Sequence, residues 1–141
     1  MDFQTIYQYS KNLIVLYVED DDILRDATLD AIEDYFGHVD SASNGEMALQ
    51  KYIQYYEKNA TYYDLVITDI NMPVMNGIDL IENIYALYKE QSIIIVSAYS
   101  ESDKIESIKH LGIKNFIMKP IAFDKLKETI YSVSKDIHQN V

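Results

Sequence analysis

The chain has 141 residues and 48% of them are hydrophobic, so it is long and apolar enough to bury one sizeable core. A formal net charge of −11 argues against direct nucleic-acid binding by this segment, and the absence of cysteine excludes disulfides, thiolate catalysis and cysteine-based metal sites. The N-terminus has no leader-like pattern and no apolar run approaches the ~18 residues of a membrane span, so we expect a cytoplasmic location away from membranes.

The first third of the chain predicts one strand and one helix. Residues 1–12 are mixed in pattern and predict an arm or a short helix. Residues 13–18 form a continuous apolar run, typical of a strand that is covered on both faces of a parallel sheet. Acidic residues 19–22 follow, and a helix then extends to about residue 35. The apolar stripe of this helix consists of Ile23, Ala27, Ala31 and Tyr35.

The rest of the chain repeats this alternation of strand and helix. Further strands are predicted at 39–42, 63–68, 93–96 and 115–118. Helices are predicted after Asn44, after Gly77, over 101–111 and from Phe123 onward. Asn44 is a residue type suited to capping the first of these helices.

Five alternating strand–helix pairs predict an α/β fold, a doubly wound five-stranded parallel sheet with right-handed crossovers and helices on both faces. No linker, repeat or low-complexity segment divides it. We therefore expect one domain over residues 13–138, with the arm or helix at 1–12 before it and a short tail at 139–141. The carboxyl ends of the strands line the ligand crevice in such sheets.

Polar side chains stand at four of these strand ends. Glu19 and Asp20 follow the first strand, Asp69 follows the third, Ser97 the fourth and Lys119 the fifth. Crowded carboxylates repel, and at an effective dielectric of ~20 two unit charges ~4 Å apart cost about 4 kcal/mol. Either a pKa rises or a cation binds, and oxygen ligands suit Mg²⁺ or Mn²⁺. With an ammonium and a hydroxyl nearby, the set predicts a phosphoryl receptor in which Asp69 is the in-line nucleophile.

Four segments, in this order, resemble the receiver domain of bacterial two-component response regulators. They read VEDD at 18–21, DINMPVMNG at 69–77, VSA at 96–98 and FIMKP at 116–120. The resemblance covers about residues 13–138 and implies a flavodoxin-like topology with strand order 2-1-3-4-5. It implies a signalling domain that catalyses its own phosphorylation and dephosphorylation, rather than an enzyme with external substrates. Asp69 would accept the phosphoryl group from a sensor histidine kinase or a histidine phosphotransfer protein.

The resemblance also implies the metal site. Asp20, Asp69 and the backbone carbonyl of Asn71 would bind Mg²⁺, with Glu19 nearby, directly or through water. We interpret the next two acidic residues, at positions 21 and 22, as helix-start residues rather than ligands.

The resemblance further implies how the phosphoryl group would be held and sensed. Lys119 and Ser97 would bind its oxygens, and Ser97 and Phe116 would form the switch. The bond between Lys119 and Pro120 would be cis. The family also uses the face formed by the fourth helix (101–111), the fifth strand and the fifth helix for dimers and partner proteins.

The lifetime of the phosphorylated form should depend on the residues that flank the path of an in-line water. By position these are Asn71, two residues after Asp69, and Tyr99, two residues after Ser97. Asn71 could orient a water but lacks the basicity of a carboxylate. The ring of Tyr99 could partly cover the path.

Three other functions are weighed against this one. A haloacid-dehalogenase-type phosphatase needs a general acid two residues after its nucleophilic Asp, where this chain has the amide of Asn71. A flavodoxin-like carrier needs a phosphate-binding loop where this chain has acidic residues 19–22. A receiver-like module used only for protein binding would typically lack some of the acidic and basic site residues. The cognate kinase and the output are not encoded in any motif, and the chain is either a stand-alone receiver or part of a longer protein.

Overall fold

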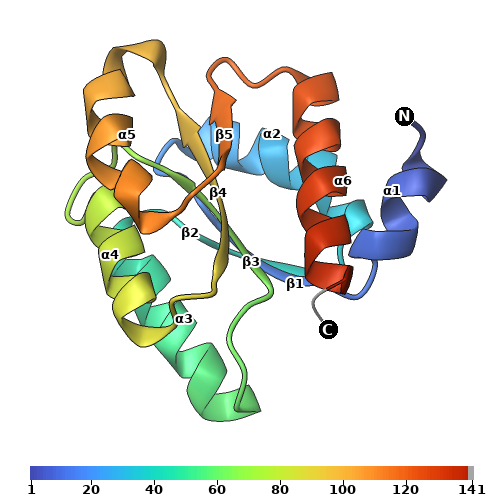
Figure 1. The fold of residues 1–141 in the computed structure, drawn as a ribbon, viewed down its shortest axis with the longest axis horizontal. Coiled ribbons are helices and arrows are strands. Elements are labelled where there is room, and N and C mark those ends of the chain that lie inside the picture. Colours follow the sequence, from blue (N-terminus) through green and yellow to red (C-terminus); the bar gives the residue numbers. More distant parts are fainter. Residues whose placement is uncertain (140–141) are drawn as a thin grey trace.

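The computed structural model describes residues 1–139, except for the side chain of Tyr99. Its strands form one parallel sheet in the order β2-β1-β3-β4-β5 (Figure 1). The strands are β1 (Ile14–Val18), β2 (His38–Ala42), β3 (Leu65–Asp69), β4 (Ser92–Ser97) and β5 (Asn115–Met118). This arrangement confirms the doubly wound sheet and the strand order expected from the sequence.

The described residues form six α-helices and three short 3-10 turns. The helices are α1 (Phe3–Ser10), α2 (Asp22–Ile32), α3 (Gly45–Asn59), α4 (Gly77–Leu87), α5 (Ser102–Ile108) and α6 (Phe123–Gln139). The turns are η1 (Glu33–Tyr35), η2 (Tyr99–Glu101) and η3 (Lys109–Leu111). None of these helices is both long and apolar enough to cross a membrane. Residues 140 and 141 of the expected tail lie outside the described residues.

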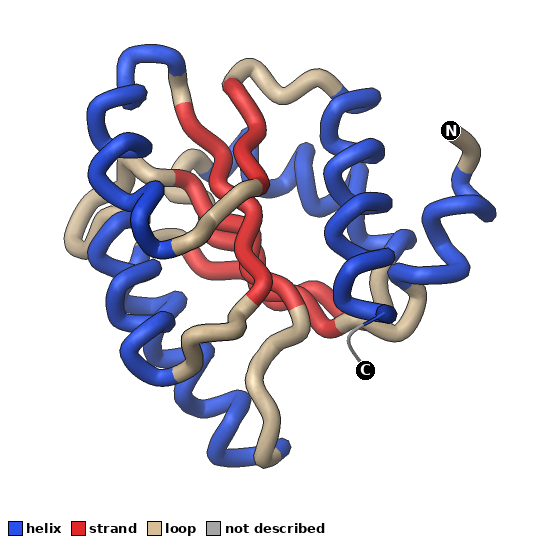
Figure 2. The backbone as a smooth tube through the Cα atoms, viewed as in Figure 1, coloured by secondary structure: helices blue, strands red, loops and turns tan. Residues whose placement is uncertain are grey.

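The sheet lies between two layers of helices (Figure 2). Helices α3, α4 and α5 cover one face, and α1, α2 and α6 lie on the other (Figure 1). Successive side chains of a strand point to opposite faces, so β1 contributes Leu16 and Val18 to one core and Val15 and Tyr17 to the other. Because both faces are covered, β1 is apolar along its whole length, as the continuous run at 13–18 predicted. The edge strand β2 is more polar and only partly buried.

Helix starts follow the capping chemistry expected from the sequence. The Asn44 side chain accepts a hydrogen bond from the Met47 N–H at 2.8 Å, which confirms its predicted role as the cap of α3. The Asp21 side chain accepts one from the Leu24 N–H at 3.0 Å and caps α2 in the same way. The prediction that Asp21 is a helix-start residue is therefore confirmed.

The predicted apolar stripe of α2 was wrong at its first two positions, whereas Ala31 is half-buried and Tyr35, which lies in η1, is buried as predicted. Ile23 is 84% exposed and Ala27 is also exposed, whereas Thr28 and Ile32 are the buried positions of this helix. The first half of the stripe was misplaced because Thr28, a polar residue type, occupies a core-facing site. The exposed Ile23 lies beside the acidic loop that follows β1.

Helix α1 packs on the outer layer rather than on the sheet. Its Ile6 is fully buried in the core shared with α2 and α6, and the Phe3 ring lies 4.9 Å from the Tyr35 ring. The Tyr9 ring meets the Tyr131 ring of α6 edge-on at 5.8 Å. Residues 1–12 are thus held to the same layer as α6.

Candidate functional site

Three carboxylates meet at the carboxyl edge of the sheet. Asp69 ends β3 and is 3% exposed, Glu19 follows β1 and is 1% exposed, and Asp20 beside it is exposed. One carboxylate oxygen of each lies within 4.8 Å of the others. The structure therefore brings together the acidic residues that the sequence predicted at one site. Oxygen-only ligands at this spacing fit a hard divalent cation such as Mg²⁺ or Mn²⁺.

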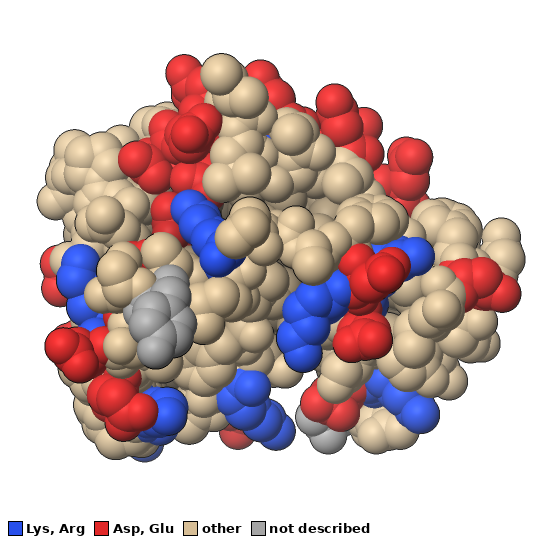
Figure 3. Space-filling view, turned by 90° about the horizontal axis from the view of Figure 1, so that it is seen from above, with Lys and Arg blue, Asp and Glu red and all other residues tan. Residues whose placement is uncertain are grey.

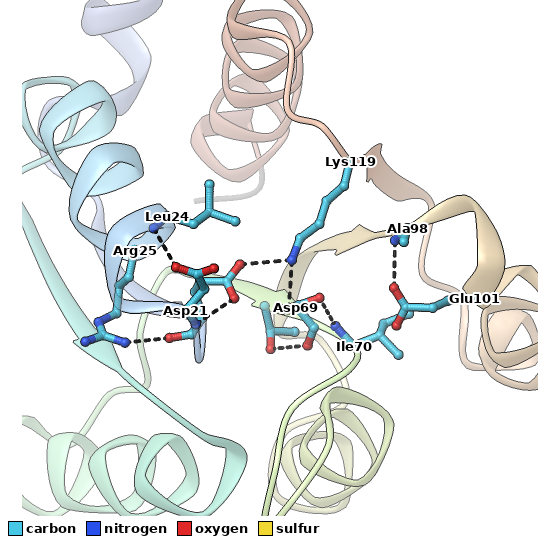
Figure 4. A network of polar contacts seen from close by, with 10 residues as sticks. Asp21, Leu24, Arg25, Asp69, Ile70, Ala98, Glu101 and Lys119 are labelled. Atoms are coloured by element: carbon cyan, nitrogen blue, oxygen red, sulfur yellow. Dashed lines mark hydrogen bonds and ion pairs between the residues drawn. The ribbon is translucent and has the colours of Figure 1, made fainter.

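Lys119 reaches this cluster from the end of β5 (Figure 4). Its Nζ lies 3.0 Å from Oδ2 of Asp69 and 3.1 Å from Oε1 of Glu19. One ammonium therefore bridges the two buried carboxylates. The Lys119–Pro120 bond is cis, as the sequence resemblance implied, and the backbone N–H of Lys119 donates to the Ser97 carbonyl at 2.8 Å.

The remaining oxygens of the two buried carboxylates accept backbone hydrogen bonds. Oδ1 of Asp69 accepts from the Ile70 N–H at 2.8 Å, and Oε2 of Glu19 accepts from the Asp21 N–H at 3.2 Å. The carbonyl oxygen of Glu19 accepts from Nη1 of Arg25 at 2.8 Å. These bonds fix both carboxylates toward the space between β1, β3 and β5.

Burial and charge set the ionisation of the site. Burial raises the pKa of Glu19 to about 7, the Asp21 N–H opposes this rise, and the Asp69 charge adds to it. Burial lowers the pKa of Lys119, but its hydrogen bonds to Asp69 and Glu19 outweigh burial and leave that pKa raised. The Lys119 ammonium therefore stays charged, while the Glu19 carboxyl loses its proton only at a higher pH than an exposed glutamate. A site in this state favours the arrival of a further cation.

The loop between β3 and α4 is folded tightly against Asp69. A Cβ on Gly77 would lie 2.1 Å from the Asp69 carbonyl oxygen, so only glycine fits where the chain returns. The Gly77 N–H donates to the Ile70 carbonyl at 2.7 Å. Val74 in the same loop has a φ of 70°, a strained value for a β-branched residue, and is 76% exposed.

The predicted switch residues lie on neighbouring strands. Ser97 ends β4 and is 1% exposed, while Phe116 of β5 is half-buried and packs against the core under α3, α4 and α5. Phe116 pairs with Ile95 in the sheet register, and Ser97 pairs with Met118. Both residues also line a cavity of about 430 Å³ that extends to Lys119.

Other predicted site residues take different positions. Asn71 is exposed in the loop after Asp69. Asp22 pairs with Arg25 at 2.6 Å, which agrees with the helix-start interpretation. The side chain of Tyr99 lies outside the described residues, so its predicted place beside the water path stays a prediction.

Sequence reasoning missed two residues beside the site. Arg25 holds the backbone of Glu19, and the only signal for it was the helical spacing of three from Asp22. Glu101 accepts a hydrogen bond from the Ala98 N–H at 2.7 Å, just beyond Ser97. Its spacing of three from Ala98 is that of the Glu in a capping box, but Ala98 lacks the Ser or Thr hydroxyl that marks this motif, so the sequence gives no signal for it.

The face that holds the site is unevenly charged. Figure 3 shows the molecule from the top of Figure 1, the side on which β4 and β5 end, with acidic side chains gathered along one margin. Lys and Arg side chains are set apart from one another on this face. The arrangement can bind a divalent cation among its carboxylates and, once their charge is neutralised, an anionic group beside Lys119.

Comparison with known proteins gives a consistent family match. The family model described as "Response regulator receiver domain" matches residues 15–131. The chain is 35% identical over 97 residues to the chemotaxis protein CheY of Treponema pallidum, with 69% of this chain and 65% of that protein covered. It is 32% identical over 142 residues to the 3',5'-cyclic-nucleotide phosphodiesterase regA of Dictyostelium discoideum, with 98% of this chain but 17% of that protein covered.

A solved structure agrees with these relatives. The crystal structure of the N-terminal domain of an uncharacterized protein from Wolinella succinogenes superposes with a TM-score of 0.79 at 30% identity. The match covers 92% of this chain and 99% of that one. The chain thus spans nearly all of this solved domain, but less than two thirds of CheY of T. pallidum and about a sixth of regA.

Proposed function

The chain belongs to the response regulator receiver domain family, and we propose that Asp69 is its phosphoryl acceptor in a two-component signalling pathway. The observation that carries the proposal is the 3.0 Å contact between Lys119 and Asp69, beside the carboxylates of Glu19 and Asp20. A nucleophilic carboxylate, an acidic metal site and a fixed cation are the parts that phosphoryl transfer needs in one place.

The reaction is an in-line displacement at phosphorus. A carboxylate oxygen of Asp69 forms a bond to phosphorus while the bond to the donor breaks. With a phosphohistidine donor the P–N bond breaks and the imidazole leaves with its electron pair and takes up a proton. With acetyl phosphate the P–O bond breaks and acetate leaves. Lys119 stabilises the oxygens of the transferring group, because its ammonium already lies against Asp69.

The metal requirement follows from charge. Glu19, Asp20 and Asp69 would hold Mg²⁺, or Mn²⁺, together with the backbone carbonyl of Asn71. The ion would neutralise the acidic cluster and polarise the phosphoryl oxygens. Without a cation, the cluster repels an incoming phosphoryl donor, because Lys119 supplies one positive charge against three carboxylates.

The signal would pass from Asp69 to the neighbouring strands. A phosphoryl group adds charge and acceptor oxygens, and the Ser97 hydroxyl would move toward them. That movement would vacate space beside the half-buried Phe116. The face formed by α5, β5 and α6 would then present an altered surface to a partner protein or to a second copy of the chain.

A sensor histidine kinase or a histidine phosphotransfer protein is the donor that this chemistry fits. Such a donor would be met in the cytoplasm, the location expected from the sequence. The acidic surface suits neither nucleic acid nor an anionic membrane as the direct partner of this segment.

Intact-mass measurement after treatment with acetyl phosphate and Mg²⁺ tests the proposal. We expect one added phosphoryl group in the wild type and none in Asp69→Asn or in excess chelator. Steady release of inorganic phosphate from a substrate ester at high turnover would instead favour a phosphatase. A full mass shift in Asp69→Asn would refute the assignment of the acceptor.

A further inference from the structure

A buried carboxylate accepts a hydrogen bond from the backbone N–H of Ala98, the residue that follows Ser97. Glu101 is 8% exposed, and its Oε1 accepts a hydrogen bond from the Ala98 N–H at 2.7 Å (Figure 4). Its other oxygen, Oε2, is buried and has no hydrogen-bond partner among the described residues. The Glu101 N–H donates in return to the Ala98 carbonyl at 3.0 Å. One oxygen of this carboxylate is therefore hydrogen-bonded to an amide, and the other is buried without a partner among the described residues.

This amide lies within reach of a group attached to Asp69. Asp69 pairs with Val96 on the adjacent strand, and Ala98 lies two residues beyond Val96 at the same edge. Strand spacing and rise put the Cα atoms of Asp69 and Ala98 about 8 Å apart. A phosphoryl group projects a few ångströms from its carboxylate, so its oxygens would enter the space that the Ala98 N–H borders.

We propose that Glu101 is a positioning residue that holds the Ala98 amide in the unphosphorylated chain and competes with the phosphoryl group for it. The inference rests on the proposed function, because the competing anion is the phosphoryl group on Asp69. In the free chain the Glu101 carboxylate stands in for that anion. In the phosphorylated chain the Ala98 N–H turns to a phosphoryl oxygen, and Glu101 is released.

The buried, unpaired Oε2 lowers the free-energy cost of releasing Glu101 from the Ala98 N–H. Breaking the bond to Ala98 forfeits one charge-assisted hydrogen bond. The freed carboxylate regains water on both oxygens, including Oε2, which is unpaired while buried. The phosphoryl group then takes the place of the Glu101 carboxylate as the acceptor, so the Ala98 N–H is hydrogen-bonded in both states.

The release also reaches the output face. Glu101 is the last residue of η2 and lies directly before Ser102, where α5 begins. Among the described residues, the cap position of α5, which is Glu101 itself, makes no side-chain hydrogen bond to the helix, and the Ala98–Glu101 hydrogen bonds connect the start of this helix to the end of β4. Loss of the bond from the Ala98 N–H would free the first turn of α5 to shift.

Beryllofluoride, a phosphoryl mimic, provides the test. It is titrated in the presence of Mg²⁺ into the wild type, Glu101→Gln and the matched control Asp103→Asn, with backbone amide NMR as the readout. Gln keeps the shape but weakens the hold on Ala98, so we expect Glu101→Gln to bind beryllofluoride about fivefold more tightly than the wild type. Asp103 is exposed in the first turn of the same helix, so its variant removes equal charge and should bind like the wild type.

The wild type alone gives a second readout that does not depend on a variant folding. Saturation with beryllofluoride should shift both the Ala98 amide and the side-chain carboxyl carbon of Glu101. A residue that serves only as a helix cap would change stability in both states equally and would leave the affinity unchanged.

The outcomes separate the two proposals. Binding by the wild type with equal affinity in Glu101→Gln and Asp103→Asn, or with an unmoved Ala98 amide, would overturn the role of Glu101 and leave the receiver function standing. No binding of beryllofluoride by the wild type in Mg²⁺ would contradict the receiver function, and the role of Glu101 would fall with it.

Discussion

Glu19 makes the metal-free protein sensitive to pH, and Glu19→Gln should remove that sensitivity. The carboxyl is 1% exposed and its pKa is raised from 4.5 to about 7 by burial, with a further contribution from the Asp69 charge. Between these two values the folded chain keeps Glu19 protonated while the unfolded chain ionises it. The unfolded state then binds fewer protons, so the free energy of unfolding falls as pH rises through this window.

The magnitude follows from the size of the pKa difference. A difference of about 2.5 units at 1.36 kcal/mol per unit corresponds to about 3 kcal/mol of stability, present below pH ~4.5 and lost by pH ~7. Gln does not titrate, and its single carbonyl oxygen replaces only one of the two Glu19 oxygens that accept hydrogen bonds from Lys119 and from the Asp21 N–H, so the substitution also carries a cost that does not depend on pH. In chelator, the free energy of unfolding of Glu19→Gln should therefore rise relative to that of the wild type by about 3 kcal/mol between pH 4.5 and pH 8.

Urea denaturation in EDTA, repeated from pH 4.5 to pH 8, measures this difference directly. Titrating groups that do not contact Glu19 affect both proteins alike and cancel in the comparison. Saturating Mg²⁺ should shift the difference toward the wild type at pH 8, because the ion stabilises the folded state and the wild type offers it one more carboxylate. A stability difference that is constant with pH, or one that moves against Glu19→Gln as pH rises in EDTA, would refute the reasoning.

Three further substitutions probe the loops around the site. Gly77→Ala should cost about 2 kcal/mol of stability and slow labelling by acetyl phosphate, because its Cβ would lie 2.1 Å from the Asp69 carbonyl oxygen. Denaturation and intact mass measure the two effects. Val74→Gly should add about 1 kcal/mol to the free energy of unfolding, since Val74 holds a φ of 70° with an exposed side chain. Tyr99→Ala should shorten the phosphorylated lifetime severalfold, measured as first-order loss of the phosphoryl group, if Tyr99 covers the water path as its position after Ser97 predicts.

Each of these three predictions can be contradicted by a specific result. Gly112→Ala is the control for Gly77, because Gly112 has a φ of 87° but open space around it, so it should cost about 1 kcal/mol and leave labelling unchanged. Similar behaviour of the two glycine variants would mean that crowding at Asp69 is unimportant. A less stable Val74→Gly would show that the loop is not strained, and an unchanged lifetime in Tyr99→Ala would show that this side chain does not shield the phosphoryl group.

The sequence predicted what depends on local pattern and on strand topology. The cap at Asn44 and the limits of β5 were predicted correctly, because capping chemistry and an apolar run are local signals. The meeting of Glu19, Asp69 and Lys119 was predicted because parallel strands end at one edge.

The contacts that the sequence did not reveal depend on side-chain packing. Thr28 turned out to be core-facing on α2, which no periodicity of apolar residues could indicate. The need for glycine at position 77 follows from how closely the chain returns to Asp69, a distance set by the whole loop. Glu101 reads in sequence as one more surface acid, and only its burial against the end of β4 sets it apart.

Locating the phosphoryl group on the chain tests the central claim most directly. After treatment with acetyl phosphate and Mg²⁺, borohydride reduces an acyl phosphate of Asp to homoserine, which tandem mass spectrometry of peptides can place in the sequence. We predict homoserine at position 69, dependent on Mg²⁺ and absent from chelator-treated protein. Homoserine at position 20 instead, or an added phosphoryl group on a hydroxyl or imidazole with position 69 unmodified, would contradict the account.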